Sequence, residues 1–220
     1  RSDSGNKLNV RVINAMTTNE TSWFRDEYPF DCLKEEIFPQ LFRSGVQAPR
    51  IWSAACSYGH EPFSLSITVE EFLEKNPGSF PGGVEIVGTD ISTQALEYAR
   101  EAQYDDLNLS RGLSGERRNK YFTREGESSH VIDRIRQRVK FFELNLLKSI
   151  YLFGKFDIVF CRNVLIYFSN ENKSDILSKI ETAMKPDAWL FLGASEPMMN
   201  YSDAFRMVKF PRGVAYQKKS

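Results

Sequence analysis

The chain is poor in the residues that build disulfide frameworks and metal sites, since its 220 residues include only three cysteines and two histidines. Cys32, Cys56 and Cys161 are scattered and odd in number, which excludes a fully paired disulfide framework and indicates a reducing compartment. We expect Cys56 and Cys161 to pack as small hydrophobic side chains rather than to act as nucleophiles. His60 and His130 lack the spacing of metal ligands, so we predict no metal site.

The chain also lacks net charge and long hydrophobic runs. Its 29 basic residues balance 29 acidic ones, so no overall field recruits nucleic acid. No run approaches the roughly 18 apolar residues of a membrane-spanning helix, and the first residues lack the apolar core of a signal peptide. We therefore expect a cytoplasmic protein with no nucleic acid partner and no membrane insertion. The start at Arg1 rather than at Met suggests a piece of a longer protein.

Basic side chains are nevertheless concentrated in one stretch of the sequence. This stretch has few acidic residues and contains Arg117, Arg118, Lys120, Arg124, Arg134, Arg136 and Arg138. A solvated face is the more common meaning of such a stretch, and a docking surface for an acidic protein is the alternative.

Strands and helices alternate from residue 50 onward. Apolar runs and periodicity predict strands at 50–55, 84–88, 139–144, 156–161 and 188–193, helices at 62–73, 92–102 and 170–184, and a hairpin at 205–211 and 213–218. This pattern predicts an α/β fold with a doubly wound, mostly parallel, Rossmann-like sheet and an antiparallel C-terminal hairpin. The polar, Arg-rich stretch at about 105–138 interrupts the alternation and is predicted to be a small inserted β subdomain.

Residues 1–45 are predicted to form a separate N-terminal segment with helices. Cap-type residues at 17–21 predict a helix start near Thr21, and Ser92 is predicted to cap the helix at 92–102. Pro29 and Pro39 predict two short helices within 23–42, because proline interrupts helical hydrogen bonding.

Three strand ends carry the residues of a predicted ligand site. The turn after the first strand keeps only Gly59 and has no full G-x-G-x-x-G pattern, so it favours an uncharged or zwitterionic ligand group over a pyrophosphate. Asp90 ends the second strand and is either an acceptor for ribose hydroxyls or a helix cap. Asn163 follows the strand at 156–161, and ligands of open α/β sheets bind at such carboxyl ends.

Five segments carry a family resemblance that runs in order across nearly the whole chain: TTNETSWFRD (17–26), WSAACSYGHEPFS (52–64), TDIS (89–92), NL (145–146) and FDIVFCRNVLIYF (156–168). They resemble the CheR family, S-adenosylmethionine-dependent methyltransferases that esterify glutamates of bacterial chemoreceptors. The resemblance implies a methyltransferase domain at 46–220, to whose site residues 1–45 contribute, and S-adenosylhomocysteine as the product. It implies cytoplasmic chemoreceptor helices as the partner of a monomer. We expect the family's N-terminal helical domain to be missing ahead of Thr17.

The roles of individual site residues follow from the resemblance alone. It implies that Asp90 binds the ribose, that Asn145 and Leu146 border the adenine, and that Glu61 contacts the cofactor. It implies that Asn19, Thr21 and Arg25 bind the cofactor near the methionine end and the methyl group. Asn163, Val164 and Tyr167 are implied to line the opposite wall, with Asn163 and Val164 also binding the cofactor. Arg25 and Tyr167 are the implied catalytic residues.

The expected chemistry needs no catalytic histidine or cysteine. A glutamate with a reference pKa of about 4.3 is already a nucleophilic carboxylate at neutral pH, so the protein has to position it and exclude water. Arg25 is suited to hold a carboxylate in a bidentate fork, and a surface salt bridge to Asp26 or Glu27 is its alternative. Three roles are open for Tyr167. Its hydroxyl orients the acceptor, its ring packs beside the methyl group, or the side chain is part of the core.

Two departures from the family pattern leave a second function open. Tyr58 and His60 stand where the family usually has threonine and an acid, and we expect Tyr58 either to narrow the cavity or to pack across it, and His60 to be exposed to solvent. A signalling module that binds the cofactor without turnover is therefore the alternative function. The segment 121–130 is shorter and poorer in glycine than in members that grip a receptor-tail peptide, so that docking mode is not expected. The absence of a glycine fingerprint disfavours a nicotinamide-dependent oxidoreductase.

Overall fold

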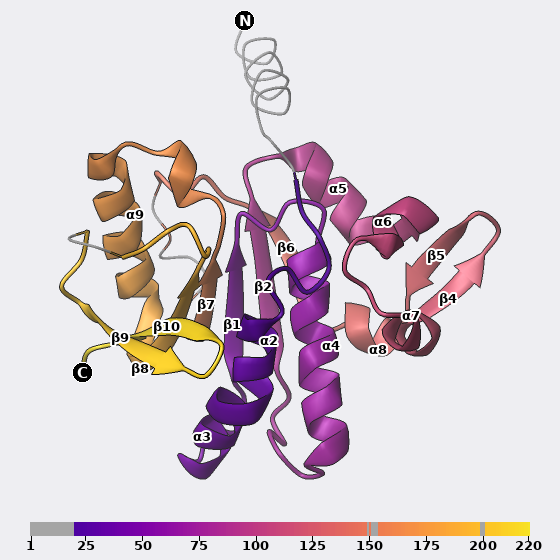
Figure 1. Cartoon of the computed structure of the whole chain (residues 1–220), viewed down its shortest axis with the longest axis horizontal. Coiled ribbons are helices and arrows are strands. Elements are labelled where there is room, and N and C mark those ends of the chain that lie inside the picture. The colour runs from indigo at the N-terminus through magenta and orange to yellow at the C-terminus, as the bar shows by residue number, and fades with distance from the viewer. Residues whose placement is uncertain (1–19, 149, 151–153, 199–200) are drawn as a thin grey trace, which may run out of the picture.

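The computed structural model describes residues 20–148, 150, 154–198 and 201–220, and its centre is a seven-stranded sheet (Figure 1). The strands are β1 (Arg50–Ala54), β2 (Glu85–Asp90), β6 (Val139–Glu143), β7 (Phe156–Cys161), β8 (Met184–Leu192), β9 (Phe205–Phe210) and β10 (Gly213–Lys218). Their order is β6-β2-β1-β7-β8-β10-β9, with β6 to β8 parallel and β10 antiparallel to both of its neighbours. The predicted doubly wound sheet with an antiparallel C-terminal hairpin is confirmed.

The order of the strands reverses beside β1, and this reversal locates the expected ligand site. The chain runs from β1 outward to β2 and β6, then returns to the other side of β1 for β7 and β8. Connections that diverge in this way leave a crevice above the carboxyl ends of the two central strands. The site is therefore expected above β1 and β7.

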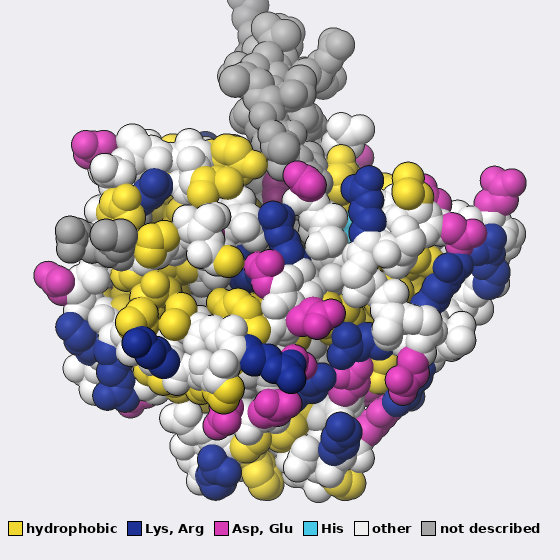
Figure 2. Space-filling view, in the orientation of Figure 1, with side chains coloured by type: hydrophobic (Ala, Val, Ile, Leu, Met, Phe, Trp, Pro, Cys, Tyr) yellow, Lys and Arg dark blue, Asp and Glu magenta, His cyan; other side chains and the backbone are white. Residues whose placement is uncertain are grey.

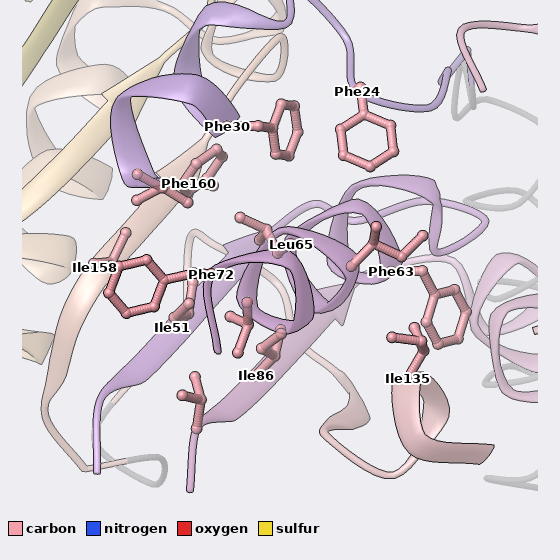
Figure 3. Packing of buried hydrophobic residues seen from close by; sticks show 14 of the residues in the cluster. Phe24, Phe30, Ile51, Phe63, Leu65, Phe72, Ile86, Ile135, Ile158 and Phe160 are labelled. Carbon is pink, nitrogen blue, oxygen red and sulfur yellow. The ribbon is translucent and has the colours of Figure 1, made fainter. Parts of the chain in front are cut away.

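Helices cover both faces of the sheet and bury two hydrophobic clusters. On one face, Ile51, Ile86 and Phe160 pack against α4 (His60–Lys75) and α2 (Tyr28–Cys32), as Figure 3 shows for Leu65, Phe72 and Phe30 of these helices. On the other face, Trp52, Val87 and Val159 pack against Ile176, Leu177 and Ile180 of α9 (Asn170–Ala183). Neighbouring strand residues thus point to opposite faces, and each fully buried large side chain contributes about 1.5–3 kcal/mol.

The N-terminal helices differ from the prediction. Helix geometry continues through α2, a π-helical turn at Leu33–Ile37 and α3 (Phe38–Arg43), so Pro39 does not separate two helices. Pro39 lies at the start of α3, directly after the π-helical turn, and such turns accommodate irregular hydrogen bonding inside a helix. The predicted helix start near Thr21 is also wrong, since residues 23–26 form a turn and α2 begins at Tyr28.

Residues 103–136 form a second, three-stranded antiparallel sheet with its own helices. It consists of β3 (Gln103–Asp105), α6 (Asp106–Ser110), α7 (Gly115–Tyr121), β4 (Phe122–Glu125), β5 (Ser128–Val131) and α8 (Asp133–Arg136), with strand order β3-β5-β4. This unit follows α5 (Thr93–Glu101), which Ser92 caps as predicted, and lies beyond α4 on the right of Figure 1.

The basic side chains of this region are paired within the chain. Each of the seven has an acidic partner, in the pairs Arg117–Glu71, Arg118–Asp106, Lys120–Glu74, Arg124–Asp106, Arg134–Glu70, Arg136–Asp133 and Arg138–Glu70. Three of the pairs join the small subdomain to an acidic row on α4, and Arg138, which lies between α8 and β6, pairs with the same row. Figure 2 shows the two signs of charge interspersed here. The basic stretch therefore holds the subdomain against α4, which neither sequence interpretation anticipated.

All three cysteines are buried and unpaired. Burial raises the pKa of the Cys56 and Cys161 thiols well above their usual value, which disfavours the nucleophilic thiolate, as predicted for packing residues. Among the residues that the structure describes, no helix is long and apolar enough to cross a bilayer, and no group of three or more His, Cys, Asp or Glu side chains is arranged to hold a metal ion.

Candidate functional site

A cavity of about 270 Å³ lies where the central strands end, and most of the predicted site residues line it. We call it the site cavity. Of the predicted residues, Thr21, Arg25, Glu61, Asp90, Asn163, Val164 and Tyr167 are in its lining. They come from the N-terminal segment (residues 20–27), the first turn of α4, the end of β2 and the loop after β7, so four separate stretches of sequence meet in one place.

The turn after β1 brings backbone close to the cavity. Ala55 and Ser57 have φ angles of 56° and 50°, in the left-handed region that costs most side chains energy, and Gly59 has 84°. A Cβ atom on Gly59 would lie 2.9 Å from the Cβ of Ala99, so glycine is also required for the close approach of α5. The small side chains of Ala55 and Ser57 leave the turn open toward the cavity.

Asp90 is a buried carboxylate whose two oxygens are both oriented by the backbone. Its Oδ2 accepts a hydrogen bond from the Ser57 N–H at 2.7 Å, and its Oδ1 accepts one from the Ser92 N–H at 2.8 Å. Burial raises the pKa of Asp90, and these N–H groups act in the opposite direction. A carboxylate has about four acceptor positions, so Asp90 retains capacity for a diol in the cavity. The N-cap of α5 is Ser92 rather than Asp90.

Arg162 is a cavity residue to which the sequence analysis assigned no role. Its side chain is 1% exposed and donates to Asp26 Oδ2 at 2.5 Å and to Glu61 Oε2 at 3.2 Å. It also donates to the Arg25 carbonyl at 3.0 Å. The sequence did contain a signal for this role, since Arg162 directly follows the six buried positions of β7. A charged side chain at such a position needs ionic or hydrogen-bonding partners when it is buried.

Glu61 completes this ion cluster inside the cavity. Its Oε1 accepts a hydrogen bond from the Ser53 hydroxyl at 2.7 Å, while Arg162 approaches the other oxygen. Burial raises the pKa of Glu61, and Arg162 and Ser53 oppose that rise. The cluster therefore presents a fixed carboxylate beside the guanidinium groups of Arg162 and Arg25.

The N-terminal segment carries Arg25 into the cavity on a strained backbone. Phe24, Asp26 and Glu27 have φ angles of 47°, 64° and 46°, a conformation that persists only when surrounding contacts impose it. Those contacts come from α4 and from the inserted subdomain. On α4, the Ser64 hydroxyl accepts a hydrogen bond from the Phe24 N–H at 3.1 Å. Asp26 pairs with Arg162, so the alternative of a surface salt bridge between Arg25 and Asp26 is not what the structure shows.

The inserted subdomain holds the same segment from the other side. The Trp23 N–H donates to the Arg111 carbonyl at 2.9 Å, and the guanidinium of Arg117 lies 3.7 Å from the centre of the Phe24 ring. A Cβ on Gly112 would come within 2.2 Å of the Trp23 carbonyl oxygen, so only glycine allows this contact. The subdomain therefore helps to place Arg25.

The loop after β7 (residues 162–168) forms another wall of the cavity. Asn163 has a φ of 58°, and Leu165–Tyr167 forms a 3-10 turn. Tyr167 is 62% exposed at the cavity, so its packing in the core, one of the predicted alternatives, is excluded.

Three predicted cofactor residues are not in the described lining. Asn19 lies outside the described residues. Leu146 is buried in the core cluster on the α9 face, and Asn145 Oδ1 accepts from the Leu147 N–H at 2.9 Å. The predicted positions of Asn145 and Leu146 beside the adenine stay predictions.

Tyr58 and His60, the two residues that depart from the family pattern, both pack outside the described cavity lining. The Tyr58 ring packs at 5.3 Å against Tyr98 on α5, and Tyr58 is not part of the described cavity lining. The prediction that His60 is exposed is wrong, because the ring is 1% exposed and lies between Trp23 and Tyr104 at centroid distances of 4.8 and 5.0 Å. Within the described residues, neither ring nitrogen has a hydrogen-bond partner.

Burial of His60 gives the protein a specific loss of stability in acid. Burial and, to a lesser extent, the Arg111 charge lower its pKa to about 4 from the usual 6.5. Above pH 6.5 the ring is neutral in both states, whereas between pH 6.5 and 4 only the unfolded chain binds the proton. The free energy of unfolding should therefore decrease as the pH is lowered from 6.5 to 4. The contribution of His60 to this decrease is up to about 3 kcal/mol.

We expect His60→Phe, which keeps a ring against Trp23, to remove this component. Denaturant titrations of both proteins from pH 7 to pH 4 measure it. Because Asp90 and Glu61 have raised pKa values in both proteins, their opposite contribution cancels in the difference. Parallel pH profiles for the two proteins would contradict the assignment.

Comparison with known proteins is consistent with this geometry. The family model for the CheR methyltransferase, SAM binding domain, matches residues 19–214. The chain is 50% identical to chemotaxis protein methyltransferase 1 of Pseudomonas aeruginosa, over 96% of this chain and 78% of that protein. It is 38% identical to the chemotaxis protein methyltransferase of Salmonella typhimurium, over 89% of this chain and 66% of that protein.

Among solved structures, the chain resembles magnesium protoporphyrin IX methyltransferase from Synechocystis with bound S-adenosylmethionine. The TM-score is 0.46 and the identity is 16%, with 89% of this chain and 83% of that chain covered.

Proposed function

Because the chain belongs to the CheR methyltransferase family, as a domain that binds S-adenosylmethionine, we propose that it transfers a methyl group to glutamate side chains of bacterial chemoreceptors. Methyl ester formation at these glutamates would serve adaptation in chemotaxis. The observation that carries the proposal is the meeting of Arg25, Glu61, Asp90 and Tyr167 in one cavity at the sheet's carboxyl edge.

The charges in the site cavity suit the groups of S-adenosylmethionine. We assign Asp90 to the ribose hydroxyls, since its buried oxygens are fixed by backbone N–H groups and keep acceptor capacity. Glu61 provides a carboxylate for the ammonium of the methionine part, and Arg25 a guanidinium for a carboxylate. When bound, the cofactor supplies a methyl group activated by a positively charged sulfur.

The residues of this chain have to position the acceptor rather than deprotonate it. A glutamate side chain is ionised at neutral pH and attacks as it is, which agrees with the buried, neutral state of His60 and the disfavoured Cys56 thiolate. Arg25 and Tyr167 both line this space, Arg25 from the N-terminal segment and Tyr167 from the loop after β7. We assign Arg25 to hold a carboxylate in line with the methyl group, and Tyr167 to orient the acceptor at the cavity mouth. Correct alignment of this kind is worth several kcal/mol of a barrier, about 7–11 in the best cases.

A module that binds the cofactor without turnover is the alternative function. It was motivated by Tyr58 and His60, and both side chains pack away from the cavity, against Tyr98 and against Trp23. The geometry therefore favours the enzyme.

The test is methyl transfer from labelled S-adenosylmethionine to a cytoplasmic helical fragment of a chemoreceptor. We expect label that alkali releases as methanol, because esters hydrolyse in base and N-methyl groups do not. Arg25→Lys should reduce the rate roughly 10–100-fold, since lysine cannot form the fork. Arg43→Lys, exposed on α3 at the opposite end of the sheet, is the matched control. Binding of S-adenosylmethionine without any transfer would instead establish the binding module.

A further inference from the structure

Glu196 is a buried carboxylate that holds the backbone of the site wall from outside the cavity. It is 6% exposed and lies in the segment after β8. Its Oε2 accepts from the Asn163 N–H at 2.5 Å and from the Gly193 N–H at 2.9 Å, and its Oε1 accepts from the Ile166 N–H at 3.1 Å. One side chain thus binds three backbone N–H groups, two of them in the loop after β7.

These hydrogen bonds replace ordinary secondary structure in that loop. Asn163 has left β7 and has a φ of 58°, a conformation that needs outside support. Ile166 is the middle residue of the 3-10 turn Leu165–Tyr167, and the ring of Tyr167 is exposed. The hydrogen bond to Glu196 therefore fixes the turn that carries this ring.

Gly193 leaves space for the Glu196 carboxylate beside Asn163. A Cβ on Gly193 would lie 2.5 Å from Glu196 Oε2 and 2.9 Å from Asn163 Nδ2, so the glycine makes room for both groups. Among the described residues, Glu196 is the only side chain that accepts from the Asn163 N–H or the Ile166 N–H.

We propose that Glu196 is a positioning residue for methyl transfer, which sets the height and angle of the wall formed by Asn163, Val164 and Tyr167. This role rests on the proposed function. It acts through the backbone, and Glu196 touches neither cofactor nor acceptor. A displacement of about 1 Å in such a wall is enough to slow a reaction about 100-fold.

The chemistry of the three hydrogen bonds predicts a graded response to substitution. In Glu196→Gln, the amide oxygen can still accept from the Asn163 and Gly193 N–H groups. The amide NH2 then takes the place of the oxygen that faces Ile166, so two donors face each other and this hydrogen bond is lost. Glu196→Ala loses all three contacts. Ser195→Ala, at the exposed neighbouring position, is the matched control.

The experiment measures kcat and KM for the receptor fragment, S-adenosylmethionine affinity by calorimetry, and amide hydrogen exchange. We expect kcat to fall about 10-fold in Glu196→Gln and about 100-fold in Glu196→Ala. The affinity for S-adenosylmethionine should change less than about threefold, because the residues assigned to its ribose and methionine ends lie on other elements, and exchange should accelerate within residues 162–168.

The outcomes separate this inference from the proposed function. Unchanged kcat with unchanged exchange in 162–168 would overturn it, and so would equal losses of activity, cofactor affinity and protection throughout the chain, since these mark a general folding role. If the parent chain binds the cofactor yet transfers nothing, the proposed function fails. In that case faster exchange confined to 162–168 still establishes that Glu196 positions the wall, and unchanged exchange excludes it.

Discussion

Replacing Arg162 with methionine should lower the free energy of unfolding by about 3 kcal/mol, because it leaves the Glu61 and Asp26 carboxylates without their buried cation. The Arg162 side chain is 1% exposed and pairs with Asp26 and Glu61, whose side chains are 35% and 16% exposed. Methionine fills similar space, so lost charge rather than a cavity dominates. We place the effect at the lower end of the range for broken buried pairs since Asp26 is partly hydrated.

The same substitution should also abolish most methyl transfer. Arg162 is the side chain that ties the N-terminal segment to β7, through the Arg25 carbonyl and Asp26. Without it, the strained backbone at Phe24, Asp26 and Glu27 loses one of its supports, and Arg25 moves from its place in the cavity. We expect the rate to fall about 100-fold.

Denaturant titration and steady-state kinetics check both effects against a matched ion pair. Lys120→Met breaks the pair with Glu74, in which the side chains are 41% and 37% exposed, and should cost less than about 1 kcal/mol. Adding Asp26→Asn to Arg162→Met should recover part of the stability but none of the activity. An Arg162→Met protein as stable as Lys120→Met would show that the cluster is fully hydrated.

The sheet was predictable because its signals are local. The buried run at β7 and the cap at Ser92 depend on neighbouring residues only, and the structure has both where the sequence predicts them. The position of the cavity was equally accessible, since parallel strands place their carboxyl ends at one edge whatever the loops do.

The supports of the site were not predictable because they join distant parts of the chain. Arg162 meets Asp26 across 136 positions and Glu61 across 101. Nothing near His60 in sequence indicates that Trp23 and Tyr104 enclose it. The turn at 24–27 has no glycine to announce its positive φ angles, since its conformation is imposed by α4 and the inserted subdomain. Local propensity was overridden by tertiary contacts where the site is built.

Replacing Asp90 with alanine should weaken the binding of S-adenosylmethionine and S-adenosylhomocysteine by about 1–3 kcal/mol, or about 5–150-fold in Kd. The carboxylate is buried, its oxygens are fixed by the Ser57 and Ser92 N–H groups, and it lines the site cavity. A ribose hydroxyl that loses this acceptor leaves a hydrogen bond unmade, which accounts for the expected loss. Calorimetric titration gives the change directly.

The loss also contains a structural part, because alanine leaves the Ser57 N–H of the turn after β1 without its acceptor. A cofactor analogue separates the two parts. S-adenosylhomocysteine with a 2′,3′-dideoxyribose should bind the parent more weakly than the natural product does, and this difference should vanish in Asp90→Ala if the carboxylate holds the diol. If the variant weakens both ligands equally, Asp90 acts through the turn, and the diol must find its acceptor elsewhere in the cavity.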